Sequence, residues 1–369
     1  MARLAYNFCP FTVGLMRKVK VVSYWFLIFS FFGLHTAIML LKFFGNAIRR
    51  PSETFKWRIR ETPPACLNDS SLGTHCYVRL KESGLRFHYV AAGEKGKPLM
   101  LLLHGFPEFW YSWRHQLREF KSEFRVVAVD MRGYGETDTP VSTQGYRPDC
   151  LITDVKDIVE CLGYNRCFLI GHDWGGFIAW LVAIRYPEMV TKLIILNSPH
   201  PSAVADYTLR HPTQLVKSLS ILLFQCPLLP ELLLSINDLQ ALKSLFTSNS
   251  TGIGRKGCSM TKEDMEAYLY VFSQPRALTG PLNYYRNIFS FLPRSQRELK
   301  CPVLLMWGER DAFLEQGLAE ASRLYISGYV RLNVISGASH WLQQDRPDVV
   351  NTLIWTFLKE AQGHKHCGN

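Results

Sequence analysis

Gly171-His172-Asp173-Trp174-Gly175-Gly176 is the most informative segment of this 369-residue chain. The apolar residues 166–171 predict a buried strand that leads into the segment, and residues 177–184 predict a helix that leaves it. A sharp turn from strand to helix needs small residues on both sides, and it lifts the central side chain clear of the backbone. The pattern therefore predicts a nucleophile elbow with Asp173 at its tip.

An aspartate at this tip changes the expected chemistry, because serine is the usual occupant. A serine alkylated at carbon gives an ether, which water does not readily cleave. A carboxylate alkylated at carbon gives an ester, which water can open at its carbonyl. Asp173 therefore indicates displacement at a saturated carbon, either the opening of an epoxide or the expulsion of a halide. The alternative is an aspartate that only caps a glycine-rich helix, and the flanking residues do not favour it.

Two further polar residues follow predicted strands and complete a catalytic set. Asp311 lies in Trp-Gly-Glu-Arg-Asp-Ala-Phe and His340 in Gly-Ala-Ser-His-Trp-Leu. The order nucleophile, acid, histidine is the one that α/β-hydrolases use. We expect His340 to act as the general base for water that attacks the Asp173 ester. We expect Asp311 to hold the imidazole tautomer and to stabilise its protonated form.

The segment 103–108, Leu-His-Gly-Phe-Pro-Glu, follows a predicted strand and has the position of an oxyanion loop. The backbone N–H groups of Phe106 and Trp174 are expected to converge on the oxyanion formed when the ester is attacked. Pro107 donates no hydrogen bond and stiffens this loop.

Apolar runs alternate with helix-like segments along most of the chain, which predicts a mostly parallel sheet with helices on both faces. Leu- and aromatic-rich helical segments replace this alternation at 203–290, as expected of an inserted helical cap. A cap there would roof a site at the carboxyl ends of the strands. We therefore expect a core formed by 72–202 and 291–369.

The charge of +11 is concentrated at the N-terminus. Residues 1–60 hold ten Lys and Arg against one Glu, and the remainder holds 32 basic and 30 acidic residues. No basic stripe is therefore expected on the catalytic part, which argues against a nucleic-acid partner. The ten cysteines show neither paired spacing nor a CxxC motif, so no disulfide framework and no zinc site are indicated. We expect no metal and no organic cofactor.

Residues 21–41 contain no Lys, Arg, Asp or Glu, and this length of helix spans a bilayer. We expect a single transmembrane anchor there, after a basic segment at 1–20 and before a juxtamembrane linker at 42–71, in the endoplasmic reticulum membrane. The run is too long and too aromatic for a cleaved signal peptide. The flanking basic residues lean slightly toward a cytosolic catalytic domain. The sequons at Asn68 and Asn249 matter only on a lumenal face, so the sidedness stays open.

These motifs resemble the α/β-hydrolase-fold epoxide hydrolases, in particular their vertebrate membrane-anchored branch. The resemblance covers roughly 72–359 and rests on the segments 104–113, 130–138 and 171–176. It implies two cap tyrosines that donate to the epoxide oxygen, and Tyr285 takes the place of the second. The first is expected four residues before the Phe of a Phe-Gln-x-Pro segment, where this chain has Ser220. The resemblance also implies substrate contacts from Trp110 and from position 220.

A serine hydroxyl is shorter and far less acidic than a phenol, so Ser220 predicts weakened rather than absent epoxide hydrolysis. Tyr207 and Tyr284 are the candidate replacements. One alternative is a haloalkane dehalogenase, which commonly has Asn or Trp as a second halide donor at the position where this chain has Phe106. Another is a catalytically weak or silent membrane-anchored binding or scaffold protein, which Ser220 favours and the complete catalytic set opposes. The anchor and the apolar cap favour a lipophilic substrate such as a fatty-acid epoxide, with water as cosubstrate.

Overall fold

The computed structural model describes residues 43–254, 258–290 and 299–360, together with scattered positions between 23 and 41. The chain divides into two units, Met1–Lys56 and Trp57–Asn369, and the second holds the catalytic segments. The first unit includes a short helix, α2 (Pro51–Thr54).

Among the described residues of the second unit, eight strands form a single sheet, in the order β1-β2-β4-β3-β5-β6-β7-β8. The pairs β1–β2 and β2–β4 are antiparallel, and every other neighbouring pair is parallel. This confirms the predicted mostly parallel sheet. The central strand β3 is apolar and buried along its whole length because helices cover both faces of the sheet. The strands are β1 (Thr74–Arg79), β2 (Arg86–Ala92), β3 (Leu99–Leu103), β4 (Arg125–Val129), β5 (Cys167–His172), β6 (Val190–Leu196), β7 (Val303–Gly308) and β8 (Val330–Ile335).

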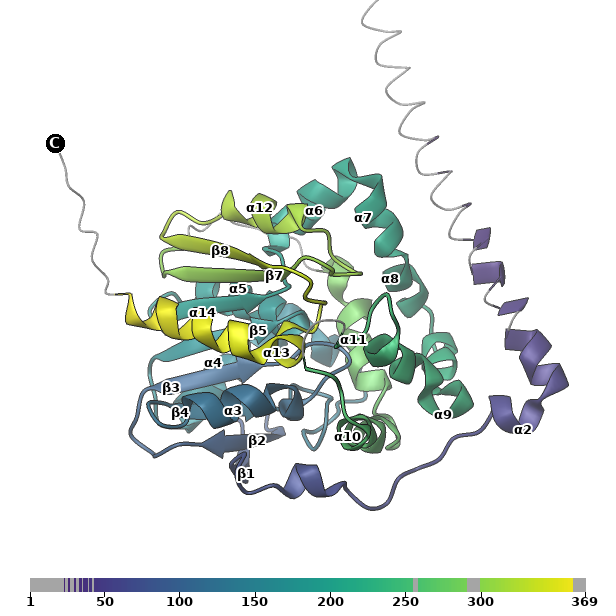
Figure 1. The fold of residues 1–369 in the computed structure, drawn as a ribbon, viewed down its shortest axis with the longest axis horizontal. Coiled ribbons are helices and arrows are strands. Elements are labelled where there is room, and N and C mark those ends of the chain that lie inside the picture. Colours follow the sequence, from purple (N-terminus) through teal and green to yellow (C-terminus); the bar gives the residue numbers. More distant parts are fainter. Residues whose placement is uncertain are drawn as a thin grey trace, which may run out of the picture. The chain divides into compact units, whose positions relative to one another are not determined.

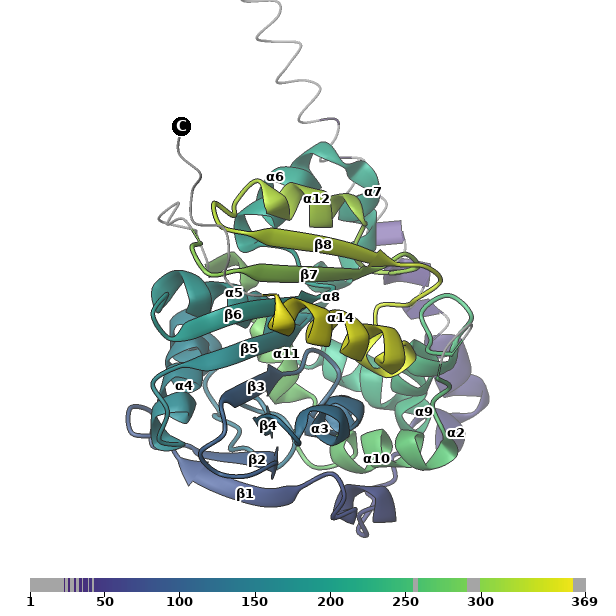
Figure 2. The same ribbon diagram turned by 60° about the vertical axis from the view of Figure 1, so that its left-hand side comes forward.

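Helices pack on both faces of this sheet (Figures 1 and 2). The helices α3 (Arg114–Phe120) and α14 (Pro347–Lys359) lie on one face, and α4 (Pro148–Cys161) and α5 (Trp174–Arg185) lie on the other. The helix α12 (Gly317–Arg323) connects β7 to β8, and α13 (Leu342–Asp345) precedes α14. Short 3-10 turns occur at η1 (Ala65–Asn68), η2 (Trp110–Trp113) and η3 (Thr143–Tyr146).

A group of helices lies between β6 and β7 in the sequence, beside the sheet in Figure 1. This is the segment for which the sequence predicts a cap. The long helix α9 is broken by non-helical backbone at 236–239. The helices are α6 (Pro201–Arg210), α7 (Pro212–Lys217), α8 (Leu219–Phe224), α9 (Leu229–Thr247), α10 (Lys262–Phe272) and α11 (Thr279–Arg286), followed by the turn η4 (Ile288–Ser290).

Most of the predicted anchor at 21–41 lies outside the described residues. In the part of the chain that the structure describes, no single helix is both long and apolar enough to cross a membrane. The helical segments 212–224 and 229–247 pass that test only as a pair, and they are bent by 96° with respect to each other.

Candidate active site

The turn at Asp173 has the close packing that a nucleophile elbow requires. Asp173 has φ 49° and ψ −118°, a strained backbone conformation for a residue with a side chain. A Cβ atom on Gly175 would lie 2.1 Å from the carbonyl oxygen of Leu103, and one on Gly171 would lie 2.5 Å from the oxygen of Gly175. Glycine at both positions therefore lets β5, the turn and the start of α5 approach one another. The predicted elbow is present.

The two carboxylate oxygens of Asp173 face different groups. The backbone N–H of Phe106 donates to Oδ1 over 2.8 Å. The oxygen Oδ2 lies 3.6 Å from Nε2 of His340, longer than a direct hydrogen bond. The side chain is 18% exposed, so the carboxylate remains accessible. One oxygen is thus held by the oxyanion loop, and the other is free to react near the imidazole.

Asp311 orients His340 through the far side of the ring. Nδ1 of His340 lies 2.7 Å from Oδ2 of Asp311, so it donates to this carboxylate and leaves Nε2 directed toward Asp173. The other oxygen of Asp311 accepts the backbone N–H groups of Phe313 and Leu314, over 2.8 and 2.9 Å. The three predicted catalytic residues therefore lie together at the carboxyl ends of the parallel strands.

Two buried carboxylates control the protonation of His340. Burial disfavours the imidazolium, but the charge of Asp311 and then the interaction with Asp173 raise the pKa of His340 to about 10. Burial likewise acts to raise the pKa of each carboxyl, and the interaction with His340 holds both below their usual value. The resting site is therefore an imidazolium between two carboxylates.

Asn197 is a functional contact that sequence reasoning missed. Its side-chain N–H donates to Oδ2 of Asp311, and its Oδ1 accepts the backbone N–H of Gly308 over 3.1 Å. Asn197 follows β6 directly and has a left-handed φ of 43°. The sequence signal for this residue was an asparagine, which tolerates a left-handed φ, immediately after a predicted buried strand.

A second buried pair lies beneath the site and was also missed. Nδ1 of His172 lies 2.6 Å from Oε2 of Glu108, and Nε2 donates to the backbone oxygen of His340 over 2.9 Å. Glu108 also accepts the backbone N–H of Gly105 over 3.1 Å. Burial acts to raise the pKa of Glu108, but the charge of His172 and its hydrogen bond hold it below its usual value. This pair connects the oxyanion loop to the histidine loop.

Tyr285 on α11 packs over the elbow from the cap. Its ring makes edge contacts with Phe106 at 5.4 Å and Trp174 at 5.1 Å between centroids, and both residues adjoin the Asp173 carboxylate. Burial and then the charge of Asp173 raise the pKa of Tyr285 well above its usual value. The phenol is therefore protonated at neutral pH and able to donate. For the Trp174 N–H, the predicted part in the oxyanion hole stays a prediction.

Ser220 lies on α8, the cap helix that faces Tyr285. Phe224, one turn later on α8, contacts the rings of Tyr285 at 4.9 Å and Phe106 at 6.0 Å. Ser220 lies one helical turn before Phe224, and its contact with substrate stays a prediction. Nε2 of Gln225 donates to the backbone oxygen of Tyr285 over 2.8 Å and fixes α8 against α11. Ser220 itself is exposed.

Neither candidate replacement tyrosine is available for the missing donor. The hydroxyl of Tyr284 is buried and donates to the backbone oxygen of Arg132 over 2.8 Å. The hydroxyl of Tyr207 donates to Oε2 of Glu315 over 3.1 Å. Tyr134, which the sequence did not single out, has a buried hydroxyl with no hydrogen-bond partner among the described residues. Its ring packs against Tyr284 at 5.5 Å.

The described contacts of Trp110 lie outside the group formed by the elbow, His340 and Tyr285. It is buried, its backbone N–H donates to Oδ1 of Asp130 over 2.9 Å, and its ring packs against His75 at 5.2 Å. None of these contacts involves the elbow or Tyr285. The structure therefore does not bring Trp110 together with the other predicted site residues, and its contact with substrate stays a prediction.

The fold, the elbow and the Asp173, Asp311 and His340 geometry define an α/β hydrolase with a carboxylate nucleophile position. The model of the α/β hydrolase fold family matches residues 98–219. Human epoxide hydrolase 4 is 63% identical over 95% of this chain and 97% of its own length. Epoxide hydrolase 3 of Xenopus tropicalis is 48% identical over 93% of this chain and 94% of its own length.

Solved structures agree with these relatives. The crystal structure of a Bacillus megaterium epoxide hydrolase in complex with an inhibitor has a TM-score of 0.71 and 31% identity to this chain. It covers 77% of this chain and 100% of the bacterial one. The chain belongs to the epoxide hydrolase family.

Proposed function

We propose that this protein is an enzyme that adds water to an epoxide to give a vicinal diol through an ester at Asp173. The observation that carries this proposal is that the two carboxylate oxygens of Asp173 face different groups. Phe106 holds Oδ1, while Oδ2 faces His340 at 3.6 Å. A serine in this turn would open the ring to a stable ether, whereas the carboxylate gives an ester that the neighbouring groups can hydrolyse.

In the first step, Oδ2 of Asp173 attacks an epoxide carbon and the carbon–oxygen bond of the ring breaks. The electron pair of that bond goes to the epoxide oxygen, which takes the phenolic proton of Tyr285. The product is a hydroxyalkyl ester of Asp173 and a tyrosinate at Tyr285. The donor is needed because an unprotonated alkoxide is a poor leaving group away from bulk water.

In the second step, the neutral ester no longer stabilises the imidazolium, and His340 releases its Nε2 proton to solvent. Water then attacks the ester carbonyl of Asp173 and gives its proton to Nε2 of His340. The oxyanion develops on Oδ1, which already accepts the Phe106 N–H over 2.8 Å. Collapse breaks the bond between the carbonyl carbon and the alkoxy oxygen, and this oxygen takes a proton from the imidazolium. The diol leaves, the carboxyl proton of Asp173 passes to Nε2 of His340 and restores the carboxylate and the imidazolium, and the phenol of Tyr285 recovers its proton from solvent.

Ser220 weakens the first step specifically, since it stands where the second epoxide donor is expected. Loss of one oxyanion donor typically costs about 100–1000-fold in rate. We expect Ser220→Tyr to raise the single-turnover rate of ester formation by up to that factor. Thr213→Tyr, at an exposed position on α7, is the matched control. Equal rates in both variants would contradict the role given to position 220.

Trapping of the ester distinguishes an enzyme from a silent scaffold. His340→Gln keeps the nucleophile and removes the base, so an epoxide is expected to leave a stable adduct on Asp173, detected by mass spectrometry of the peptide. His211→Gln, on a cap histidine away from the elbow, should turn over without an adduct. If no epoxide in a broad panel labels Asp173, the proposed function is wrong. Release of halide from a chloroalkane would instead support dehalogenation.

A lipophilic epoxide and a membrane anchor at 21–41 belong to the same proposal. The segment that follows the first unit joins the cap: Nε1 of Trp57 donates to the backbone oxygen of Ser273 over 3.0 Å, and Arg60 pairs with Glu266 over 2.9 Å. These bonds attach the start of the second unit to the cap, whose apolar helices favour a substrate that partitions from lipid. Endoplasmic reticulum membrane is the proposed location.

Two measurements test this part. The full chain should float with liposomes, and a variant without residues 1–41 should stay in the aqueous fraction; equal flotation would contradict the anchor. Turnover of fatty-acid epoxides should exceed that of small aryl epoxides, and the reverse preference would contradict the lipophilic substrate. Neither result bears on the ester at Asp173, which the trapping experiment tests separately.

A further inference from the structure

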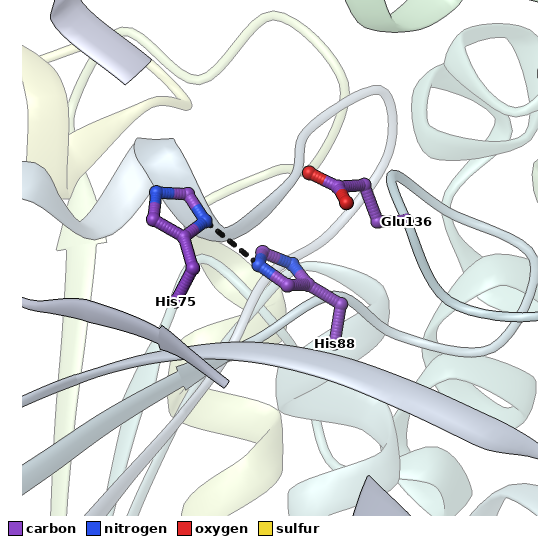
Figure 3. A group of neighbouring side chains, drawn as sticks. All are labelled: His75, His88 and Glu136. Carbon is purple, nitrogen blue, oxygen red and sulfur yellow. Dashed lines mark hydrogen bonds between the residues drawn. The ribbon is translucent and has the colours of Figure 1, made fainter. Parts of the chain in front are cut away.

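His75, His88 and Glu136 lie together at the edge of the sheet, away from the hydrolytic residues. His75 is on β1, His88 is on β2, and Glu136 is in the loop after β4. One ligand atom from each lies within 4.8 Å of the others. Figure 3 shows the two imidazoles facing each other with the carboxylate beside them.

The outer nitrogen of each imidazole is fixed by an acceptor. Nε2 of His75 lies 2.8 Å from the backbone oxygen of Leu67, so this nitrogen carries a hydrogen. Nδ1 of His88 lies 2.7 Å from Oδ2 of Asp130. Asp130 also accepts the backbone N–H groups of Trp110 over 2.9 Å and Glu136 over 3.1 Å, one on each oxygen, so it accepts from His88 as a carboxylate.

The inner nitrogens then present two lone pairs to each other. Nδ1 of His75 and Nε2 of His88 are 2.9 Å apart. With neutral rings this contact is repulsive, and only a cation between the nitrogens makes it favourable. The cation is either a proton, which makes one ring an imidazolium, or a metal ion.

Three features favour a metal ion. A carboxylate and a backbone carbonyl on the outer N–H groups are the arrangement that orients zinc-binding histidines. Glu136 adds an oxygen ligand, and two imidazoles with one carboxylate form a known zinc donor set. His88 is fully buried, whereas His75 and Glu136 are exposed, which gives an ion access from solvent.

We propose that His75, His88 and Glu136 form a binding site for a divalent zinc-class ion, with the fourth position open to water. Zinc–nitrogen bonds of about 2.0–2.1 Å need nitrogens somewhat further apart than 2.9 Å. The exposed ring of His75 supplies this by a small rotation. Tyr77, which donates to Oε2 of Glu136, leaves Oε1 for the ion.

The ion would brace the loop next to the oxyanion segment. Asp130, the partner of His88, also accepts the backbone N–H of Glu136 over 3.1 Å. Met131, which follows Asp130, donates its backbone N–H to Nε2 of His104 over 3.0 Å. Binding should therefore raise the melting temperature of the protein.

The test uses the full chain in detergent, stripped with EDTA and titrated with Zn²⁺ by calorimetry, and with Co²⁺ followed by its visible absorption. We expect one ion per chain in the wild type. His75→Ala and Glu136→Gln should each weaken binding by about 100-fold or more, since loss of an outer partner alone costs 10–100-fold. They should also abolish the rise in melting temperature with Zn²⁺.

His211→Ala is the matched control, because it removes a partly exposed histidine on the cap and should bind like the wild type. Unchanged melting of the apo variants verifies that each still folds. Wild-type affinity in His75→Ala would overturn the site and indicate metal capture by cysteines. Absence of one-to-one binding in the wild type would also overturn it, and would mean that the imidazoles share a proton.

Discussion

Neutralising Asp173 should convert His340 from a resting acid into a base. The Asp173→Asn side chain has the shape of the carboxylate and the zero charge of the ester. Two charges 3.6 Å apart, at an effective dielectric constant of about 20, interact by about 4–5 kcal/mol, or ~3 pKa units. The pKa of His340, raised to about 10 by Asp311 and Asp173, should therefore fall to near 7 in the variant.

NMR titration of the ring carbons of labelled histidine measures this pKa, with His340→Gln giving the assignment. Asp149→Asn, at an exposed position, should leave the value unchanged. A pKa that stays above about 9 in Asp173→Asn would refute the reasoning, because His340 would then remain protonated beside an ester and unable to accept a proton from water.

The same shift fixes the sign of a pH effect on stability. The pKa of His340 is higher in the folded protein than the ~6.5 of an unfolded chain, so its contribution to stability is fully present below pH ~6.5 and is lost as the pH rises toward 10. The free energy of unfolding of the wild type should therefore fall more between pH 7 and 10 than that of Asp173→Asn. Parallel pH profiles would contradict this.

Further variants separate the parts of the site. Tyr285→Phe should slow ester formation by about 100–1000-fold in single-turnover assays, with no comparable effect on hydrolysis of an ester already formed. Glu108→Gln should lower the free energy of unfolding by about 1–3 kcal/mol in denaturant titrations. Both oxygens of this buried carboxylate accept hydrogen bonds, from Gly105 at Oε2 and from Gln343 and Gln344 at Oε1, whereas an amide keeps only one acceptor oxygen. Gly175→Ala should cost about 3 kcal/mol or more, since its Cβ would lie 2.1 Å from the oxygen of Leu103; a loss below 1 kcal/mol would show that the turn relaxes.

The sequence predicts the catalytic residues that directly follow strands. It does not predict which residues of neighbouring strands will contact them. Asp173, Asp311 and His340 were predictable because parallel strands end at one edge, so strand ends in any order converge there. Asn197 was not, because its contact with Asp311 depends on β6 and β7 being neighbours, with Leu196 opposite Met306. The spacing of residues along the sequence does not show which strands will be neighbours or how they are aligned.

The histidine pair at the sheet edge illustrates the same limit. His75 and His88 are diagonal neighbours because β1 and β2 pair antiparallel, with His75 opposite Val90 and Tyr77 opposite His88. Glu136 joins them from a loop far along the chain. The expectation of no metal rested on the spacing of the cysteines and did not consider these three residues, whereas the proposal of a site follows from the fold.

The division of the active site between sheet and cap explains how Ser220 can be tolerated. The groups that hydrolyse the ester, His340 and the Phe106 N–H, lie on loops of the sheet and are fixed by buried bonds. The proposed donor to the epoxide oxygen, Tyr285 on α11, packs against Phe106, and α8 packs against Tyr285 through Phe224. A substitution on α8 therefore changes the first step while the second keeps its geometry. Because the slower step limits turnover, activity should follow the cap residue, and the hydrolytic machinery should keep its full rate for any ester that does form.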